Sequence, residues 1–139
     1  MAEIKSPGYK NYDGKVKKKP FELVQRCQTL SAEIHSSLSN SPKEFRVSIC
    51  KQVQNLSYEL IHTIRIANSF PLGSPDRGAA QADAYEEMER INDLLPVLRK
   101  LRCITPTQEA EICKKLGSLQ FGFTKWLESD KERQSGKDS

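Results

Sequence analysis

Glu59 and His62 are the residues whose spacing suggests a metal site, because they form a Glu-x-x-His pair. That spacing places both side chains on one face of a helix, as in the di-iron carboxylate sites of four-helix bundles. Such a site needs two of these pairs and two further glutamates. The chain has only two histidines, and Ala32 stands three residues before His35. We therefore expect no metal or other cofactor, and we expect His62 at the surface or its boundary.

Gly117 and Gly122 have the glycine spacing of a phosphate-binding loop. That loop needs Lys and then Ser or Thr after the second glycine, but here Phe123 follows within a helical pattern. We interpret the two glycines as positions where a neighbouring helix approaches closely. With two histidines in all, no set of nucleophile, base and orienting residue can be assembled, so we expect no enzymatic activity.

The cysteines and the apolar runs predict the compartment. Cys27, Cys50, Cys103 and Cys113 include no Cys-x-x-Cys pair, which a zinc site would need. They read as small hydrophobic residues in a reducing compartment. No apolar run reaches the roughly 18 residues of a membrane span, and the first residues lack the apolar stretch of a signal peptide. We expect a cytoplasmic protein with no membrane contact.

Charge is the chemistry that remains. The chain of 139 residues has 22 Lys and Arg against 18 Asp and Glu, and the net charge of +4 lies wholly in residues 1–20. Basic groups on this arm and on two helices could contact nucleic-acid phosphates. The alternative is a solvated arm and an ordinary alternation of surface charges. The predicted nucleic-acid-binding residues are Lys17, Lys18, Lys19, Arg46, Lys51, Arg65, Arg99, Lys100 and Arg102.

The elements that must carry these groups are helices. Apolar residues recur every three or four positions over 24–38, 45–64, 85–101 and 112–127, which is the helical period. Short connections between the first and second helices, and between the third and fourth, require antiparallel neighbours. We predict an all-α, single up-down-up-down four-helix bundle over residues 21–129. Residues 1–20 are expected to form a flexible basic arm, and residues 130–139 a frayed polar tail.

Two helix starts have the residues of a capping box. Ser41-Pro42-Lys43-Glu44 supplies an N-cap serine, an early proline and a glutamate, and Thr105-Pro106-Thr107-Gln108 repeats the device. In the fourth helix, Phe121 and Trp126 lie off the strict apolar stripe. We predict that one of them faces another subunit or a partner, and an ordinary position at the edge of the core is the alternative.

Two segments carry a family resemblance. Pro42-Lys-Glu-Phe-Arg46 with the following long helix, and Leu98 to Gln108 with the stretch from Leu116 to Phe123, resemble a group of bacterial four-helix-bundle proteins. The group includes the accessory variability determinants of diversity-generating retroelements and the proteins encoded in intervening sequences of 23S ribosomal RNA genes. Gly117 and Gly122 match the pattern of this group, whereas Phe121 replaces a glycine and Phe123 a tryptophan. The resemblance covers roughly residues 20–128.

The basic character and the Thr-Pro turn favour the retroelement branch. The resemblance then implies a homo-oligomer, a pentameric barrel of bundles with a basic surface. Such a barrel binds a reverse transcriptase and its template RNA, and supports mutagenic synthesis of complementary DNA. We thus expect a non-catalytic accessory protein of a reverse transcriptase. The alternative is an oligomeric helical scaffold or adaptor with no nucleic-acid role.

Overall fold

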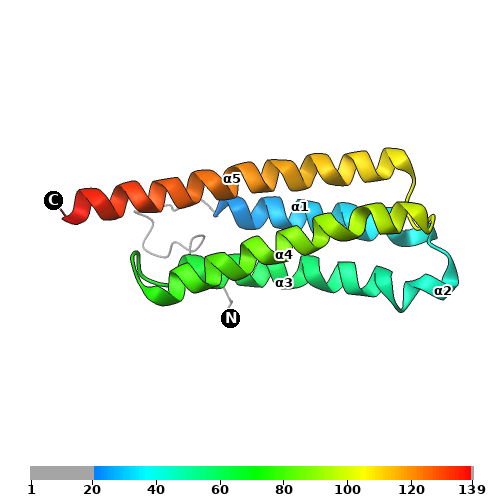
Figure 1. Cartoon of the computed structure of the whole chain (residues 1–139), viewed down its shortest axis with the longest axis horizontal. Coiled ribbons are helices and arrows are strands. Elements are labelled where there is room, and N and C mark those ends of the chain that lie inside the picture. Colours follow the sequence, from blue (N-terminus) through cyan, green and yellow to red (C-terminus); the bar gives the residue numbers. More distant parts are fainter. Residues whose placement is uncertain (1–20, 139) are drawn as a thin grey trace, which may run out of the picture.

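The computed structural model describes residues 21–138, so the predicted arm with Lys17, Lys18 and Lys19 lies outside the described residues. Four long helices and two short ones make up this part of the chain (Figure 1). The elements are α1 (Glu22–Ser37), η1 (Leu38–Asn40), α2 (Lys43–Arg46), α3 (Ile49–Ser69), α4 (Pro75–Lys100) and α5 (Pro106–Asp138).

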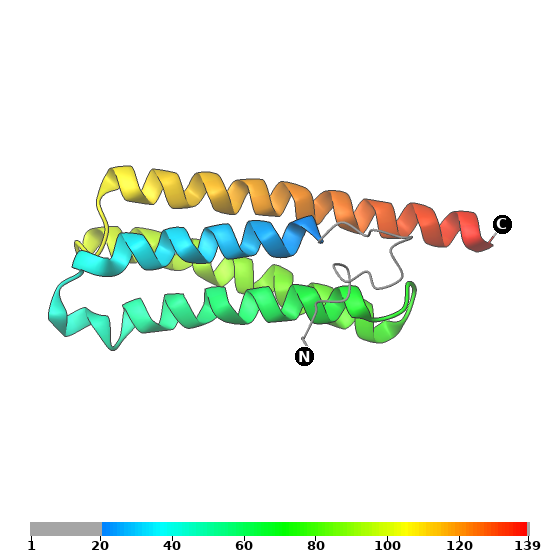
Figure 2. The same cartoon turned by 180° about the vertical axis from the view of Figure 1, so that it is seen from behind.

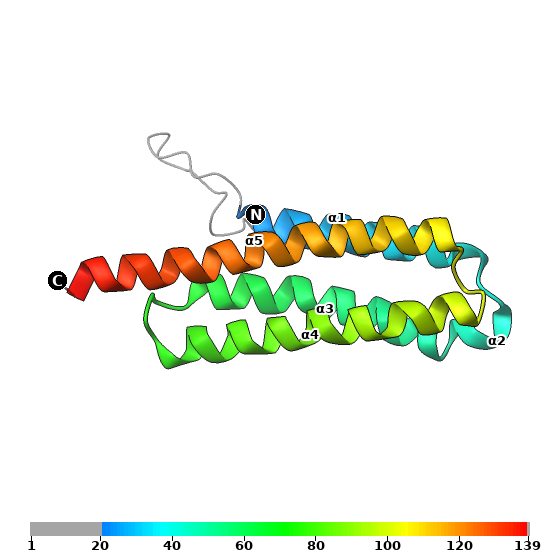
Figure 3. The same cartoon turned by 45° about the horizontal axis from the view of Figure 1, so that its top comes forward.

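The four long helices pack lengthwise against each other with alternating direction, which confirms the predicted all-α bundle. α3 packs most extensively on α4, and α1 packs on both α3 and α5. Figures 2 and 3 show that α2 and the α4–α5 connection lie at one end of the bundle, and the α3–α4 connection at the other. No helix within residues 21–138 is long and apolar enough to cross a membrane.

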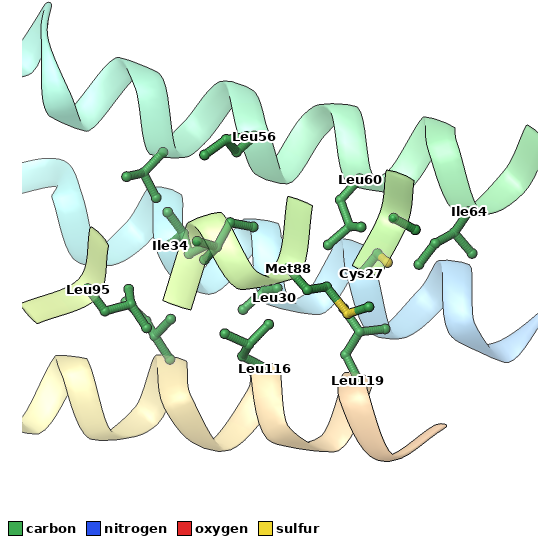
Figure 4. Close-up of a cluster of buried hydrophobic side chains, with 14 of the residues drawn as sticks. Cys27, Leu30, Ile34, Leu56, Leu60, Ile64, Met88, Leu95, Leu116 and Leu119 are labelled. Atoms are coloured by element: carbon green, nitrogen blue, oxygen red, sulfur yellow. The ribbon is translucent and has the colours of Figure 1, made fainter. Parts of the chain in front are cut away.

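The core follows a heptad spacing on every long helix. Figure 4 shows buried side chains from the four helices meeting along the bundle axis. On α5 the buried positions step by four and three residues through Ile112, Leu116, Leu119, Phe123 and Trp126. This repeat is the one that keeps an apolar seam facing its neighbours in a left-handed bundle.

Two residues of the predicted stripes lie outside this core. Tyr85 is 55% exposed and Leu127 is 38% exposed. The heptad repeat places Ala84 and Trp126, their immediate neighbours, at the seam instead. Tyr85 and Leu127 are apolar, but each lies one position away from the buried seam of its helix and therefore faces outward.

The second predicted helix is broken in the structure. α2 ends at Arg46 and α3 begins at Ile49, and the backbone of Ser48 between them is neither helical nor extended (φ −115°, ψ −101°). The Ser48 hydroxyl donates to the carbonyl oxygen of Phe45, which offers the backbone a local alternative to the helix. Val47 is 81% exposed, so packing against the core does not stabilise a continuous helix at this position.

The capping predictions have different outcomes. The Thr105 box is confirmed, since the backbone N–H of Gln108 donates to Thr105 Oγ1 (3.0 Å) and that of Thr105 donates to Gln108 Oε1 (2.9 Å). Ser41 does not cap its helix. Its buried hydroxyl instead donates to the carbonyl oxygen of Cys103 at 3.0 Å.

The frayed tail predicted from residue 130 is helical in the structure. α5 continues to Asp138 and extends beyond the start of α1 (Figure 1). Asp130 is only 8% exposed because it pairs with Arg77 of α4. This contact holds the end of α5 against the neighbouring helix.

The two glycines of α5 have different surroundings. A Cβ at Gly122 would lie 2.5 Å from Arg26 Nη1 and 2.9 Å from Leu23 Cδ2, which confirms the close approach expected there. Within residues 21–138, a Cβ at Gly117 would meet nothing within 4 Å, so no helix of this part of the chain approaches it closely.

Alanine substitution should therefore separate the two glycines. We expect Gly117→Ala to raise the free energy of unfolding by about 0.5–1 kcal/mol, because alanine favours the helix. Gly122→Ala should lose this gain, since Leu23 is buried and must shift. Urea unfolding followed by circular dichroism measures both variants, and an equal gain in both would contradict the packing at Gly122.

Candidate functional site

Two connections far apart in the sequence meet at the end of the bundle that carries α2. The Ser41 hydroxyl joins the α1–α2 connection to the α4–α5 connection through the carbonyl of Cys103. Arg46 Nε in turn donates to the carbonyl oxygen of Ser41 at 2.9 Å. These bonds place Arg46 beside the chain segment that contains Arg102. We call residues 38–52 and 97–108 together the α2 end.

Arg102 occupies a backbone position that glycine normally fills. α4 ends in a Schellman motif, in which the N–H of Cys103 donates to Leu98 and the N–H of Arg102 to Arg99. The motif needs a left-handed residue, and Arg102 has φ +63°. For a residue with a Cβ this conformation costs roughly 1–2 kcal/mol. An exposed cation thus occupies a strained backbone position.

The α2 end concentrates positive charge. Its residues include six Lys and Arg against one acidic residue, a net charge of +5, or +4 when Glu109, the partner of Arg99, is counted with them. The other residues of 21–138 hold ten basic against fifteen acidic side chains, a net charge of −5. The bundle is neutral as a whole, with an excess of positive charge at the α2 end.

The predicted basic residues are only partly brought together. Arg46, Lys51, Lys100 and Arg102 are exposed at the α2 end. Arg99 also lies there, but its Nε is 2.5 Å from Glu109 Oε1, so its charge is neutralised locally. The structure adds Lys43, an exposed residue of α2 that our prediction did not include.

Arg65 is separated from this group. It lies 14 residues beyond Lys51 on α3, about 21 Å along the helix axis. Its guanidinium contacts His62 Nδ1 at 3.2 Å on the exposed surface. The surface position expected for His62 is confirmed.

Phe121 and Trp126 have different environments. Phe121 is 64% exposed, with the ammonium of Lys125 at 5.4 Å from its ring centre. Trp126 is 8% exposed and packs edge to face on Phe21 and Phe123. Trp126 is already covered by its own chain, so Phe121 is the residue of the two that retains a surface for a partner.

A buried polar cluster near the opposite end of the bundle was not predicted. Arg77 makes a bidentate ion pair with Asp130, with N–O distances of 2.7 and 2.9 Å, and Gln81 Nε2 donates to the same carboxylate at 2.9 Å. Arg77 Nη1 also donates to the carbonyl oxygens of Asn68 and Phe70. The cluster ties the end of α3 and the start of α4 to α5, which is a structural role.

Glu87 carries a poorly satisfied carboxylate between α3 and α4. Its Oε2 accepts from Thr63 Oγ1 at 3.2 Å, whereas its Oε1 is buried with no hydrogen-bond partner within the described structure. Burial raises the pKa of the Glu87 carboxyl above its ordinary value, and Glu59 and Asp83 add to the shift. The folded state therefore disfavours the charged form of this side chain.

Neutralising Glu87 should stabilise the protein at neutral pH. In Glu87→Gln the folded state no longer holds a charge that it disfavours, so the melting temperature at pH 7 should rise. As the pH falls through the raised pKa, Glu87 becomes protonated in the folded wild type, and the stability of the wild type rises toward that of the variant. Below about pH 4, where the unfolded carboxyl is also protonated, the two curves should meet. Calorimetric scans from pH 7 to 4 test this, and a constant difference across the range would contradict it.

The cysteines are mostly buried. Cys27, Cys50 and Cys103 lie in the core, as expected for small hydrophobic residues, whereas Cys113 is exposed. Burial raises the pKa of the Cys27 thiol to about 12 and that of Cys103 to about 11. These two thiols stay protonated at neutral pH and are poor nucleophiles.

The fold and the polarised surface define an all-helical protein of four long helices with a basic end. No protein-family model matches the sequence, and the comparison with curated proteins gives no match either.

Proposed function

We propose that the chain is a non-catalytic nucleic-acid-binding protein that contacts phosphates through the α2 end. The observation that carries the proposal is the net positive charge of the α2 end, +5 or, with Glu109 included, +4, in a bundle whose other residues are acidic on balance. Clustered cations release counterions when they meet phosphates, and this favours binding without reading the sequence. The resemblance described above supplies the biological setting, an accessory protein of a retroelement reverse transcriptase and its template RNA.

The strained backbone at Arg102 also supports a binding role. A glycine at this position would close the same helix end at lower cost, yet an arginine stands there. Local strain that brings no packing gain is typical of residues kept for contact with a ligand. Arg102 is exposed, so its side chain contributes little to the core.

Salt dependence tests the proposal. With about five phosphate contacts to single-stranded RNA, affinity should fall on the order of 100-fold between about 50 and 200 mM salt. Fluorescence anisotropy of a labelled RNA, titrated with the full chain at several salt concentrations, measures the slope. If the chain binds no RNA at the lowest salt, the proposal fails.

The second candidate function is a protein-interaction scaffold, and the outer face of α5 favours it. Phe121 is exposed there, and Gly117, one helical turn earlier, has open space above its Cα. A helix from another subunit could approach the backbone at Gly117 and cover the Phe121 ring. Self-association through this face would fit the homo-oligomer expected from the resemblance.

Phe121→Glu tests the scaffold. If the α5 face joins subunits, the charge should dissociate the assembly and leave the monomer folded, because Phe121 is not part of the core. Sedimentation equilibrium gives the mass of both proteins, with Tyr85→Glu as a control at an exposed aromatic residue on α4. A wild-type chain that is already monomeric at high concentration would exclude self-association through this face.

A further inference from the structure

A groove between α3 and α4 opens directly beside the α2 end. It has a volume of about 610 Å³, which lies in the range of small-ligand sites. It reaches the break between α2 and α3, since Val47 and Ser48 are among the residues that line it. Lys51 belongs both to the groove and to the basic α2 end.

The lining of the groove combines apolar side chains with polar and charged ones. Leu56 and Leu94 are apolar side chains that lie in or against the core. The other lining residues offer the amides of Gln52 and Asn55, the cations of Lys51 and Arg90, and the carboxylates of Glu59 and Asp93. Hydrogen-bond donors, hydrogen-bond acceptors and apolar side chains thus line the same groove.

This chemistry fits a nucleobase better than a phosphate. Glu59 and Asp93 would repel a phosphate, and they balance the charges of Lys51 and Arg90 within the groove. A carboxylate is instead the acceptor for an exocyclic amino group, such as N4 of cytosine or N6 of adenine. Uracil presents the oxygen O4 at the corresponding place, which a carboxylate disfavours.

We propose that this groove receives an unpaired base of single-stranded RNA and prefers adenine or cytosine to uracil. The inference rests on the proposed function, because the α2 end must hold the phosphates of the same strand. The base next to those phosphates then reaches the groove at Val47 and Lys51. Proteins recognise RNA bases in this way chiefly where the strand is single and its bases are unstacked.

The test compares oligomers of adenylate, cytidylate and uridylate of about 12 nucleotides, titrated with the full chain. At one low salt concentration, the wild type should bind the first two at least about fivefold more tightly than uridylate. Asp93→Ala should reduce this ratio, even if the lost negative charge raises affinity for all three oligomers. Glu86→Ala is the matched control, since it removes one exposed carboxylate of α4 outside the groove and should keep the ratio.

The outcomes separate this inference from the proposed function. RNA binding with equal affinities for the three oligomers overturns the base-binding groove and leaves the phosphate contacts standing. A preference that neither Asp93→Ala nor Glu59→Ala reduces also overturns it. Absence of binding to every oligomer overturns the proposed function, and the groove with it.

Discussion

Asp130→Ala should lower the free energy of unfolding by about 3–5 kcal/mol, the cost of leaving a buried charge without its partner. The side chains of Arg77 and Asp130 are 6% and 12% exposed, so water cannot replace the lost carboxylate. Gln81 would lose its acceptor as well. Urea unfolding followed by circular dichroism measures the change.

Glu132→Ala is the matched control for this variant. Glu132 is an exposed carboxylate two residues further along α5, and its removal should change stability by less than about 0.5 kcal/mol. Arg77→Met combined with Asp130→Leu should be less damaging than Asp130→Ala, because no buried charge is left alone. A loss below about 1 kcal/mol in Asp130→Ala would show that the ion pair does not hold α5 to α4.

The same pair gives the bundle a defined response to acid. Burial alone would raise the pKa of the Asp130 carboxyl, but hydrogen bonds from Arg77, Gln81 and Arg133 outweigh burial and hold the pKa below its ordinary value. The stability that Asp130 supplies is therefore complete above the unfolded pKa of about 3.9 and is lost as the pH falls through the lower folded value. The difference in stability between the wild type and Asp130→Ala should shrink over that range.

The fold could be predicted from the sequence because apolar residues recur with a strong helical period. The cluster of Arg77, Gln81 and Asp130 was missed because the same period continues there in polar residues. On α5 the heptad steps lead from Trp126 to Asp130, and on α4 they lead back from Ala84 to Gln81 and Arg77. These three polar residues occupy core positions. Continuing the heptad spacing past the last apolar residue of each helix would have predicted these core positions. It would not have predicted that Arg77 pairs with Asp130, which lies 53 positions away.

The basic end was only partly predictable for a different reason. Clusters of cations are visible in the sequence near Arg46 and near Lys100, but nothing local shows that the two connections touch. The hydrogen bond from Ser41 to Cys103 joins them, and the sequence favoured Ser41 as a helix cap instead. Arg65 has the same charge as its neighbours, and only the length of α3 excludes it from the group.

Removing three exposed cations of the α2 end should reduce RNA affinity at low salt by ~100-fold, about 1 kcal/mol for each phosphate contact. The variant combines Lys43→Gln, Lys100→Gln and Arg102→Gly. The logarithmic dependence of affinity on salt should become shallower by about 2, since each contact with a single strand contributes about 0.7. Anisotropy titrations with one labelled RNA at several salt concentrations measure both quantities.

This variant should fold at least as well as the wild type, so lost binding has a clear cause. Arg102→Gly relieves a left-handed backbone that costs an arginine roughly 1–2 kcal/mol, against about 0.5–1 kcal/mol of added chain entropy for glycine. Lys43 and Lys100 are exposed, and their replacement leaves the core unchanged. Urea unfolding of the variant checks this expectation before any binding is compared.

The control removes the same charge elsewhere on the bundle, with Arg65→Gln, Lys125→Gln and Lys131→Gln. All three residues are exposed and lie outside the α2 end. If binding depends on a local cluster, this control should keep affinity at about 0.1 M salt within a few-fold of the wild type, because charges beyond the Debye length of about 10 Å at that salt concentration are largely screened. Equal losses in both variants would mean that RNA responds to net charge alone, and the α2 end would then have no special role.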